Sequence, residues 1–167
     1  FDHLIEMIVT ATIRYLNKQI DAGAEVIQLF DSWSGILDET LFEKYVIAAT
    51  KDIVDGVRKT HPHIPVIGFP RCAGYMYEPY IDGTGISAVG VDPYVPLDQV
   101  RRLQKKVPVQ GNLDPAYLLA GEDACLSKVT EIIEALSDGP HIFNLGHGVN
   151  KETDPARVAA VTKKLRK

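Results

Sequence analysis

The sequence predicts an α/β fold in which parallel strands alternate with helices. Short apolar runs rich in β-forming residues recur along the 167 residues, and each run stops at Gly, Pro, Asp, Asn or Ser. Between these runs lie longer segments whose apolar residues recur every three or four positions, as on one face of a helix. This alternation indicates about five right-handed βα units and a parallel sheet.

The first element is an expected amphipathic helix over residues 3–21. Its apolar face is formed by Leu4, Ile5, Ile8, Ile13, Leu16 and Ile20. Ala22 and Gly23 end this helix. The run 25–30 (EVIQLF) is then expected to be a buried strand, and the small polar residues 31–35 are expected to form a loop.

The same order of strand, loop and helix repeats along the rest of the chain. The further strands are expected at 66–69, 88–91, 107–110 and 141–145. The helices between and after them are expected at 38–59, through Tyr80, and at 97–105, 123–136 and 155–165. A turn is expected at 111–115, and Asp154 is expected to cap the last helix, which begins with Pro155.

Two architectures are compatible with this order. One is a complete doubly wound sheet, and the other is the last five strands of a (β/α)8 barrel, a fold of about 250 residues. Periodicity alone favours the doubly wound sheet. In both architectures, the chemistry belongs at the carboxyl ends of the strands, where the loops converge.

Composition excludes several classes of partner. The chain has 18 Lys and Arg against 22 Asp and Glu, a net charge of -4, so a general attraction to nucleic acid is not expected. The first segment is too charged for a signal peptide or a membrane span. Cys72 and Cys125 are too few and too far apart for a disulfide framework, which favours a reducing, cytoplasmic setting.

Polar and functional side chains follow each expected strand. They are Asp31, Ser32, Trp33, Pro70, Arg71, Cys72, Asp92, Tyr94, Asn112, Asp114, Asn144 and His147. Each one alone is typical of a turn or a helix cap, whereas their clustering at strand ends indicates a site. Asp114 is expected to cap the helix beginning near Pro115, and Asn112 is expected to stabilise its own turn through a hydrogen bond.

Two of these residues are the strongest candidates for ligand binding. His147 lies between two glycines, where the backbone can approach a ligand closely, although a turn histidine fits the same pattern. Ser32 has no catalytic base at motif spacing and no GxSxG elbow, so a hydrogen-bonding role is expected. Cys72 and His147 lack further ligands at zinc spacing, and neither GxGxxG nor a Walker motif occurs, so neither metal nor dinucleotide is expected.

Five segments together carry a family resemblance. They are FDSWSG (30–35), PVIGFPRCAG (65–74), VGVDPYVPL (89–97), VQGNLDP (109–115) and HIFNLGHGV (141–149). In this order and spacing they resemble the C-terminal half of the uroporphyrinogen decarboxylase family, over nearly the whole chain. The resemblance implies a partial (β/α)8 TIM barrel, with residues 1–167 as the C-terminal part of a single domain. The N-terminal strands would then be absent; the chain also lacks an initiating Met and opens inside an expected helix.

The resemblance also implies an activity. The family converts uroporphyrinogen III to coproporphyrinogen III by removing four acetate carboxyl groups, with no metal or organic cofactor. The protonated pyrrole serves as the electron sink, so the enzyme only stabilises charge and delivers a proton. An Asp and several arginines of the family's N-terminal half have no counterpart here, so no catalytic residue is assigned and the isolated fragment is expected to be inactive.

By position in these motifs, Ser32 and His147 match the family's substrate-contacting serine and histidine, and both are expected to meet the same polyanionic tetrapyrrole. Phe30 is expected to line the cleft. Arg71 stands where the family more usually has lysine or a small residue, and two roles remain open for it: contact with a substrate propionate, or pairing with a surface acid.

The family is usually a homodimer, so a homodimer or association with the missing N-terminal half is expected. One alternative is a corrinoid-dependent methyltransferase of the same superfamily, which needs an HxC zinc pair and a later cysteine. Pro70 stands in the place of that histidine, and His147 lies near the place of the later cysteine. The other alternative is a non-catalytic binding fragment.

Overall fold

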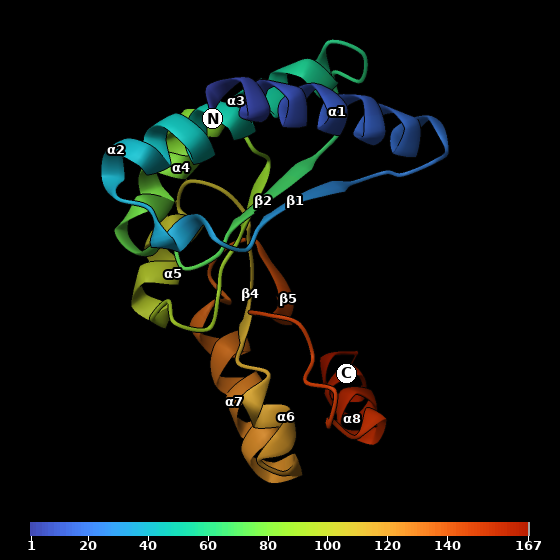
Figure 1. Cartoon of the computed structure of the whole chain (residues 1–167). Helices are drawn as coiled ribbons and strands as arrows, with labels where there is room; N and C mark the ends of the chain where they lie inside the picture. The colour runs from blue at the N-terminus through green and yellow to red at the C-terminus, as the bar shows by residue number, and fades with distance from the viewer. Residues whose placement is uncertain (167) are drawn as a thin grey trace. The chain divides into compact units, whose positions relative to one another are not determined.

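The computed structural model describes residues 1–166 (Figure 1). The chain divides into two compact units, Phe1–Val89 and the segment from Gly90 onward. In both units strands alternate with helices along the chain, as the sequence predicts, and the strands pair in parallel. The molecule is therefore of the α/β class.

The first unit contains three strands and the helices between them. Its helices are α1 (Asp2–Asp21), α2 (Glu39–Phe42), α3 (Ala48–Arg58) and α4 (Tyr77–Thr84). Its strands are β1 (Ile27–Asp31), β2 (Val66–Pro70) and β3 (Ala88–Gly90). β1 pairs with β2 from Ile27 opposite Val66 to Asp31 opposite Pro70, and β2 continues to β3 with Ile67 opposite Ala88.

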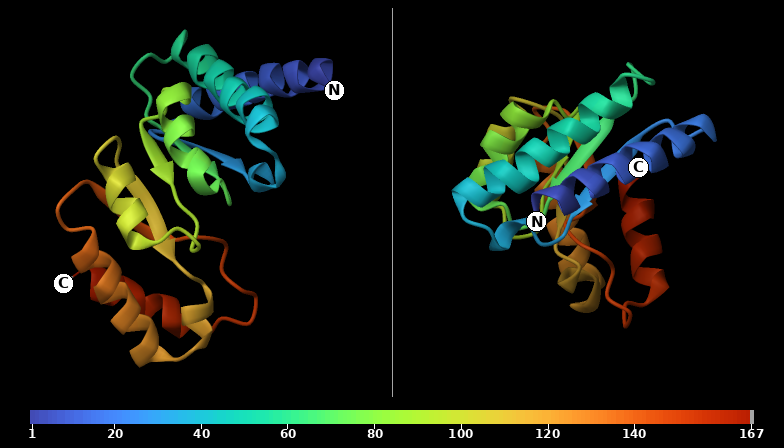
Figure 2. Two further views of the ribbon diagram at one scale, coloured as in Figure 1. Left: turned by 90° about the vertical axis from the view of Figure 1, so that its left-hand side faces the viewer. Right: turned by 45° about the horizontal axis from the view of Figure 1, so that its top comes forward.

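The core of this unit lies where the helices cover the sheet (Figure 2). All five residues of β2 are buried, which fits a central strand of a parallel sheet. α1 and α3 pack closely, because a Cβ on Gly56 would lie 2.4 Å from Cδ1 of Ile13. Tyr77 and Tyr80 bring α4 into the same core, with at most 1% of either side chain exposed.

The long helix expected at 38–59 is continuous but not regular. Asp38 caps α2 through its Oδ1, which accepts a hydrogen bond from the Leu41 amide at 2.9 Å. A π-helical turn, Glu43–Ile47, then separates α2 from α3. Apolar spacing does not reveal a π turn, since Phe42 and Val46, four residues apart, are both buried as in a regular helix.

The second unit has two full strands, β4 (Val109–Leu113) and β5 (His141–Leu145), which pair in parallel from Val109 opposite His141 to Leu113 opposite Leu145. Its helices are α5 (Leu97–Gln104), α6 (Ala116–Leu119), α7 (Glu122–Ala135) and α8 (Pro155–Leu165). The fully buried side chains of α5 and α7 include Val100, Leu103, Val129 and Ile132.

One expected turn is wrong. Residues 111–113, expected to begin the turn after the fourth strand, belong to β4 and pair with Phe143, Asn144 and Leu145. Gly111 has φ +132°, and a Cβ there would lie 2.6 Å from the carbonyl oxygen of Val91, so the close approach of two backbones requires this glycine. The turn begins at Asp114, whose Oδ1 accepts a hydrogen bond from the Ala116 amide at 2.9 Å.

The last helix is confirmed in both its bounds and its cap. α8 begins at Pro155, and Oδ1 of Asp154 accepts a hydrogen bond from the Ala156 amide at 2.9 Å. None of the helices within residues 1–166 combines the length and apolar character that a membrane span needs.

Candidate functional site

The carboxyl end of the first unit's sheet carries an aromatic pair in which one ring is exposed. Phe30 on β1 lies opposite Phe69 on β2, and their rings meet edge to face with centroids 6.0 Å apart. Phe30 is 70% exposed, while Phe69 is buried. Because side chains alternate between the faces of a strand, the exposed Phe30 ring lies on a face of β1 that the first unit leaves uncovered.

Ser32 and Arg71 extend the same region beyond the strand ends. The amide of Arg71 donates a hydrogen bond to the carbonyl of Asp31 at 3.0 Å, so the pairing of the β1 and β2 segments continues past Pro70. Ser32 follows Phe30 by two residues, and Arg71 follows Phe69 by two residues. The structure therefore brings Phe30, Ser32 and Arg71 together at two neighbouring strand ends.

A buried serine holds these two loops together. The hydroxyl of Ser34 donates to the carbonyl of Arg71 at 3.0 Å and to that of Asp31 at 3.3 Å. The amide of Gly35 also donates to the Arg71 carbonyl, at 3.2 Å. A Cβ on Gly35 would lie 2.3 Å from the carbonyl oxygen of Cys72, so only glycine fits. Sequence reasoning missed Ser34, because its main contact is 37 residues away.

Asp31 has a structural role in this loop. Its Oδ1 accepts a hydrogen bond from the Trp33 amide at 3.3 Å, which fixes the turn that leads to Ser34. Burial raises the pKa of the Asp31 carboxyl, and hydrogen bonds from the amides of Trp33 and Ser34 oppose that rise.

Ser32 and Arg71 both have free hydrogen-bonding capacity. Ser32 is exposed, and its hydroxyl makes no hydrogen bond within residues 1–166. Arg71 is half-buried, and in the same range its guanidinium has neither an ion pair nor a hydrogen bond. The role of a surface-paired arginine, which the sequence left open for Arg71, is thus not supported.

The second unit places His147 in the loop after β5. The imidazole is exposed and has no hydrogen-bond partner in the described part of the chain. Gly146 donates its amide to the carbonyl of Leu113 at 2.8 Å, and a Cβ there would lie 2.6 Å from Cδ of Pro93. Gly146 thus lets the loop pass close to its neighbour, while His147 stays accessible.

Asn112 has a different role from the one expected. Its Nδ2 donates to the carbonyls of Asp92, at 3.1 Å, and Val95, at 2.9 Å. Asn112 is buried, so this amide fixes the loop after β3 and not its own turn. The same loop is tightened by Oδ1 of Asp92, which accepts a hydrogen bond from the Tyr94 amide at 2.9 Å and leaves the Tyr94 ring exposed.

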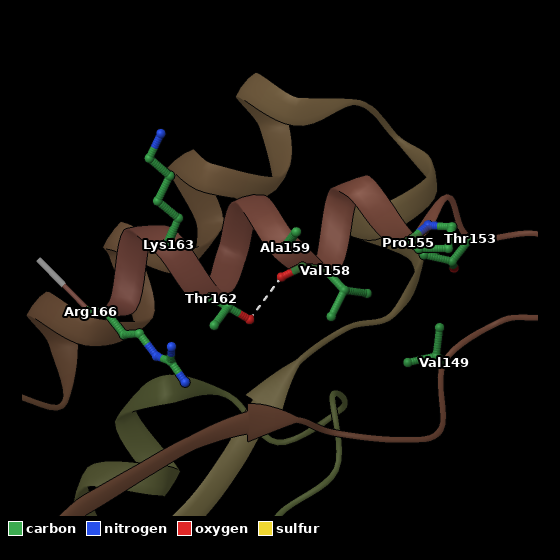
Figure 3. Close-up of a pocket in the computed structure, with 8 residues that line it drawn as sticks. All are labelled: Val149, Thr153, Pro155, Val158, Ala159, Thr162, Lys163 and Arg166. Carbon is green, nitrogen blue, oxygen red and sulfur yellow. Dashed lines mark hydrogen bonds between the residues drawn. The ribbon is translucent and has the colours of Figure 1, made fainter.

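A separate hollow of about 920 Å³ lies along α8 (Figure 3). Its lining residues are Val149, Thr153, Pro155, Val158, Ala159, Thr162, Lys163 and Arg166. Four of these eight side chains are apolar, the other four are two threonines, Lys163 and Arg166, and none is a carboxylate, an imidazole or a thiol. The hollow therefore combines an apolar surface with two cationic side chains and has no carboxylate–imidazole or thiol–imidazole pair.

Residues 1–166 contain no group of three or more His, Cys, Asp or Glu side chains that could hold a metal ion. Of the four candidate residues, Phe30, Ser32 and Arg71 lie in the first unit and His147 lies in the second. Each is positioned by a strand end, as the sequence predicts.

The family model and the curated relatives that match this chain all indicate the same family. The model of the family described as "Uroporphyrinogen decarboxylase (URO-D)" matches residues 1–167. A uroporphyrinogen decarboxylase of Chelativorans sp. (strain BNC1) is 47% identical over 166 residues, which cover 99% of this chain and 48% of the relative. Another, from Acidiphilium cryptum, is 49% identical over 164 residues, which cover 98% of this chain and 46% of the relative. The chain thus spans about half the length of the curated relatives it matches.

A solved structure supports the architecture. A methyltransferase from Methanosarcina mazei superposes with a TM-score of 0.76, covering 93% of this chain and 46% of that one. At 18% sequence identity this likeness shows the fold alone. Together with five parallel strands that alternate with helices, it confirms the expected class, a partial (β/α)8 barrel.

Proposed function

The chain belongs to the uroporphyrinogen decarboxylase family, and from this membership we propose that residues 1–167 form the later part of a single (β/α)8 barrel domain that decarboxylates uroporphyrinogen III. The reaction removes the four acetate carboxyl groups and gives coproporphyrinogen III, a step of heme biosynthesis. The observation that carries the proposal is the accessibility of Ser32 and His147. Each lies in a family motif at a strand end, and neither has a hydrogen-bond partner within the described residues.

The chemistry requires little from the protein beyond charge stabilisation and proton delivery. A proton added to a pyrrole carbon makes the ring cationic, and the electrons of the bond to the carboxylate flow into that ring as carbon dioxide leaves. In the net reaction one proton replaces one carbon dioxide, so an acetate becomes a methyl group. Groups that orient the carboxylates and stabilise their charge therefore determine which side chain reacts.

Within this reaction Ser32 donates a hydrogen bond to a substrate carboxylate. His147 makes the same type of contact, and the bond becomes charge-assisted when the imidazole is protonated. Phe30, 70% exposed beside Phe69, supplies an apolar wall for the tetrapyrrole. We assign no proton donor to this chain.

The test is a chimaera of residues 1–167 with the half of the Chelativorans relative that the match leaves uncovered. We expect this protein to convert uroporphyrinogen III to coproporphyrinogen III, measured by chromatography of the oxidised products. Ser32→Ala and His147→Asn should each lower kcat/KM about tenfold, because each removes a hydrogen bond to a charged group.

Matched controls separate site effects from general ones. Ser127→Ala and His3→Asn change exposed residues of the same types elsewhere, and both should leave kcat/KM unchanged. A folded chimaera without turnover, next to an active Chelativorans protein, would contradict the proposed function.

The proposal includes a homodimer in the cytoplasm. It is supported by the family's usual dimeric state and by two cysteines that are both free. Light scattering after size-exclusion chromatography of the chimaera should give twice its monomer mass. The corrinoid-dependent methyltransferase is not favoured, since Pro70 cannot ligate zinc, and zinc analysis of the purified protein distinguishes the two activities.

A further inference from the structure

We propose that Arg71 binds a carboxylate of the tetrapyrrole next to Ser32. This inference rests on the proposed function and concerns a residue to which that proposal gives no role. The steps that lead to it are the position of Arg71, its lack of a partner, and the way its backbone is held.

The position follows from the pairing of β1 with β2. Asp31 lies opposite Pro70, and the Arg71 amide donates a hydrogen bond to the Asp31 carbonyl at 3.0 Å. This places Arg71, just after β2, beside Ser32, just after β1. Adjacent strands lie about 4.8 Å apart, so side chains from both strand ends can contact the same carboxylate. Phe30 and Phe69, two residues before Ser32 and Arg71 along the chain, form an edge-to-face aromatic pair.

The guanidinium of Arg71 is without a partner in a half-buried position. Its Nε is buried and makes no hydrogen bond, and within residues 1–166 no carboxylate approaches the group. A guanidinium presents five N–H donors in a fixed fork that matches a carboxylate. Leaving such donors partly desolvated is unfavourable, and a bound anion would remove that cost.

The adjacent acid does not neutralise Arg71. The Asp31 carboxylate accepts from the Trp33 amide, and burial raises its pKa with only backbone hydrogen bonds acting in the other direction. A guanidinium in contact would instead lower that pKa. The positive charge of Arg71 is therefore available to a ligand.

The backbone of Arg71 is fixed before any ligand arrives. Its carbonyl accepts two hydrogen bonds, from the Ser34 hydroxyl at 3.0 Å and the Gly35 amide at 3.2 Å. Its amide is engaged by Asp31. With the backbone immobilised, only the side chain is ordered on binding, which lowers the entropic cost of forming a bidentate contact.

The first experiment measures binding of uroporphyrin III, the stable oxidised form of the substrate, to the 167-residue chain by porphyrin fluorescence. We expect Arg71→Gln to weaken binding about tenfold, as for loss of a charge-assisted hydrogen bond. Arg71→Lys should weaken it less, because the charge remains but the fork is lost. Arg14→Gln, at an exposed arginine of α1, should have no effect. Equal affinities of Arg71→Gln and the unchanged chain would overturn the proposal.

The second experiment measures urea unfolding of the same variants and needs no ligand. Replacing an unpaired, half-buried guanidinium should leave the free energy of unfolding unchanged or raise it, while ligand affinity falls. A marked loss of stability in Arg71→Gln would show a structural role and overturn the proposal.

The outcomes separate this inference from the proposed function. Turnover by the chimaera with an unaffected Arg71→Gln would overturn the inference alone. Binding of uroporphyrin that depends on Arg71, in a chimaera without turnover, would support the inference and contradict decarboxylation. A folded chimaera that neither binds uroporphyrin nor turns over uroporphyrinogen III would overturn both.

Discussion

At the scale of single residues, Tyr80 shows how a buried side chain couples stability to pH. Its side chain is 1% exposed, and burial raises the pKa of the phenol to about 12, partly offset by a hydrogen bond with Thr50. An unfolded tyrosine has a pKa near 10. Between these two values the folded chain holds a proton that the unfolded chain has lost.

Stability should therefore fall as the pH rises from about 10 to about 12, and below 10 the contribution of Tyr80 is fully present. The loss is of order 2–3 kcal/mol at most. Tyr80→Phe should remove this part of the alkaline dependence, because phenylalanine does not titrate. Urea midpoints at pH 9 and pH 11 measure it, and identical pH profiles for both proteins would contradict the expectation.

The sequence located residues but not all of their partners. Ser32 and Phe30 lie exposed at the end of β1, where the motif FDSWSG placed them. Ser34 of the same motif was not foreseen as the anchor of Arg71, because that bond joins segments far apart along the chain. Local patterns indicate which residues lie at a strand end, whereas long-range pairing decides which one is buried.

At the scale of elements, sequence reasoning succeeded where local signals agree with the fold. β5 and α8 have the expected bounds, since Gly139, Pro140 and Gly146 flank the strand and Asp154 precedes Pro155. β4 was ended too early, because Gly111 and Asn112 are turn formers locally and only the pairing with β5 makes them a strand. The π turn Glu43–Ile47 has no sequence signal of this kind.

The loop after β3 should depend on Asn112. Replacing it by alanine removes both hydrogen bonds to the Asp92 and Val95 carbonyls, which should cost about 2–3 kcal/mol, although the Asp92 carbonyl still accepts from the Val95 amide at 3.3 Å. Asn144, its neighbour across the ladder, is exposed, so Asn144→Ala is a matched control with an expected cost below about 1 kcal/mol. Urea unfolding compares the two, and equal losses would contradict the assigned role.

At the scale of the whole molecule, apolar surface lies open at both the first and the last elements. In the first unit a hollow of about 600 Å³ runs between α1 and β1 and is lined by residues that include Ile5, Ile8 and Leu29. In the second unit the lining surface of the hollow on α8 is more apolar than that of the hollow between α1 and β1. Patches of this kind favour association.

The 167-residue chain studied alone should therefore bind 1-anilinonaphthalene-8-sulfonate, self-associate at micromolar concentration, and show no turnover of uroporphyrinogen III. The dye signal should fall in the chimaera, where further strands cover these surfaces. Dye fluorescence, sedimentation and product analysis test the three points. A monomeric, active chain without dye uptake would contradict them.

The shared carbonyl of Arg71 has a consequence for motion. Because Ser34 and Gly35, both in the loop after β1, hold the chain just after β2, neither loop can open by itself without breaking bonds in the other. The two strand ends thus behave as a single opening unit whose amides exchange with deuterium together. A ligand bound at either loop would then slow exchange at both.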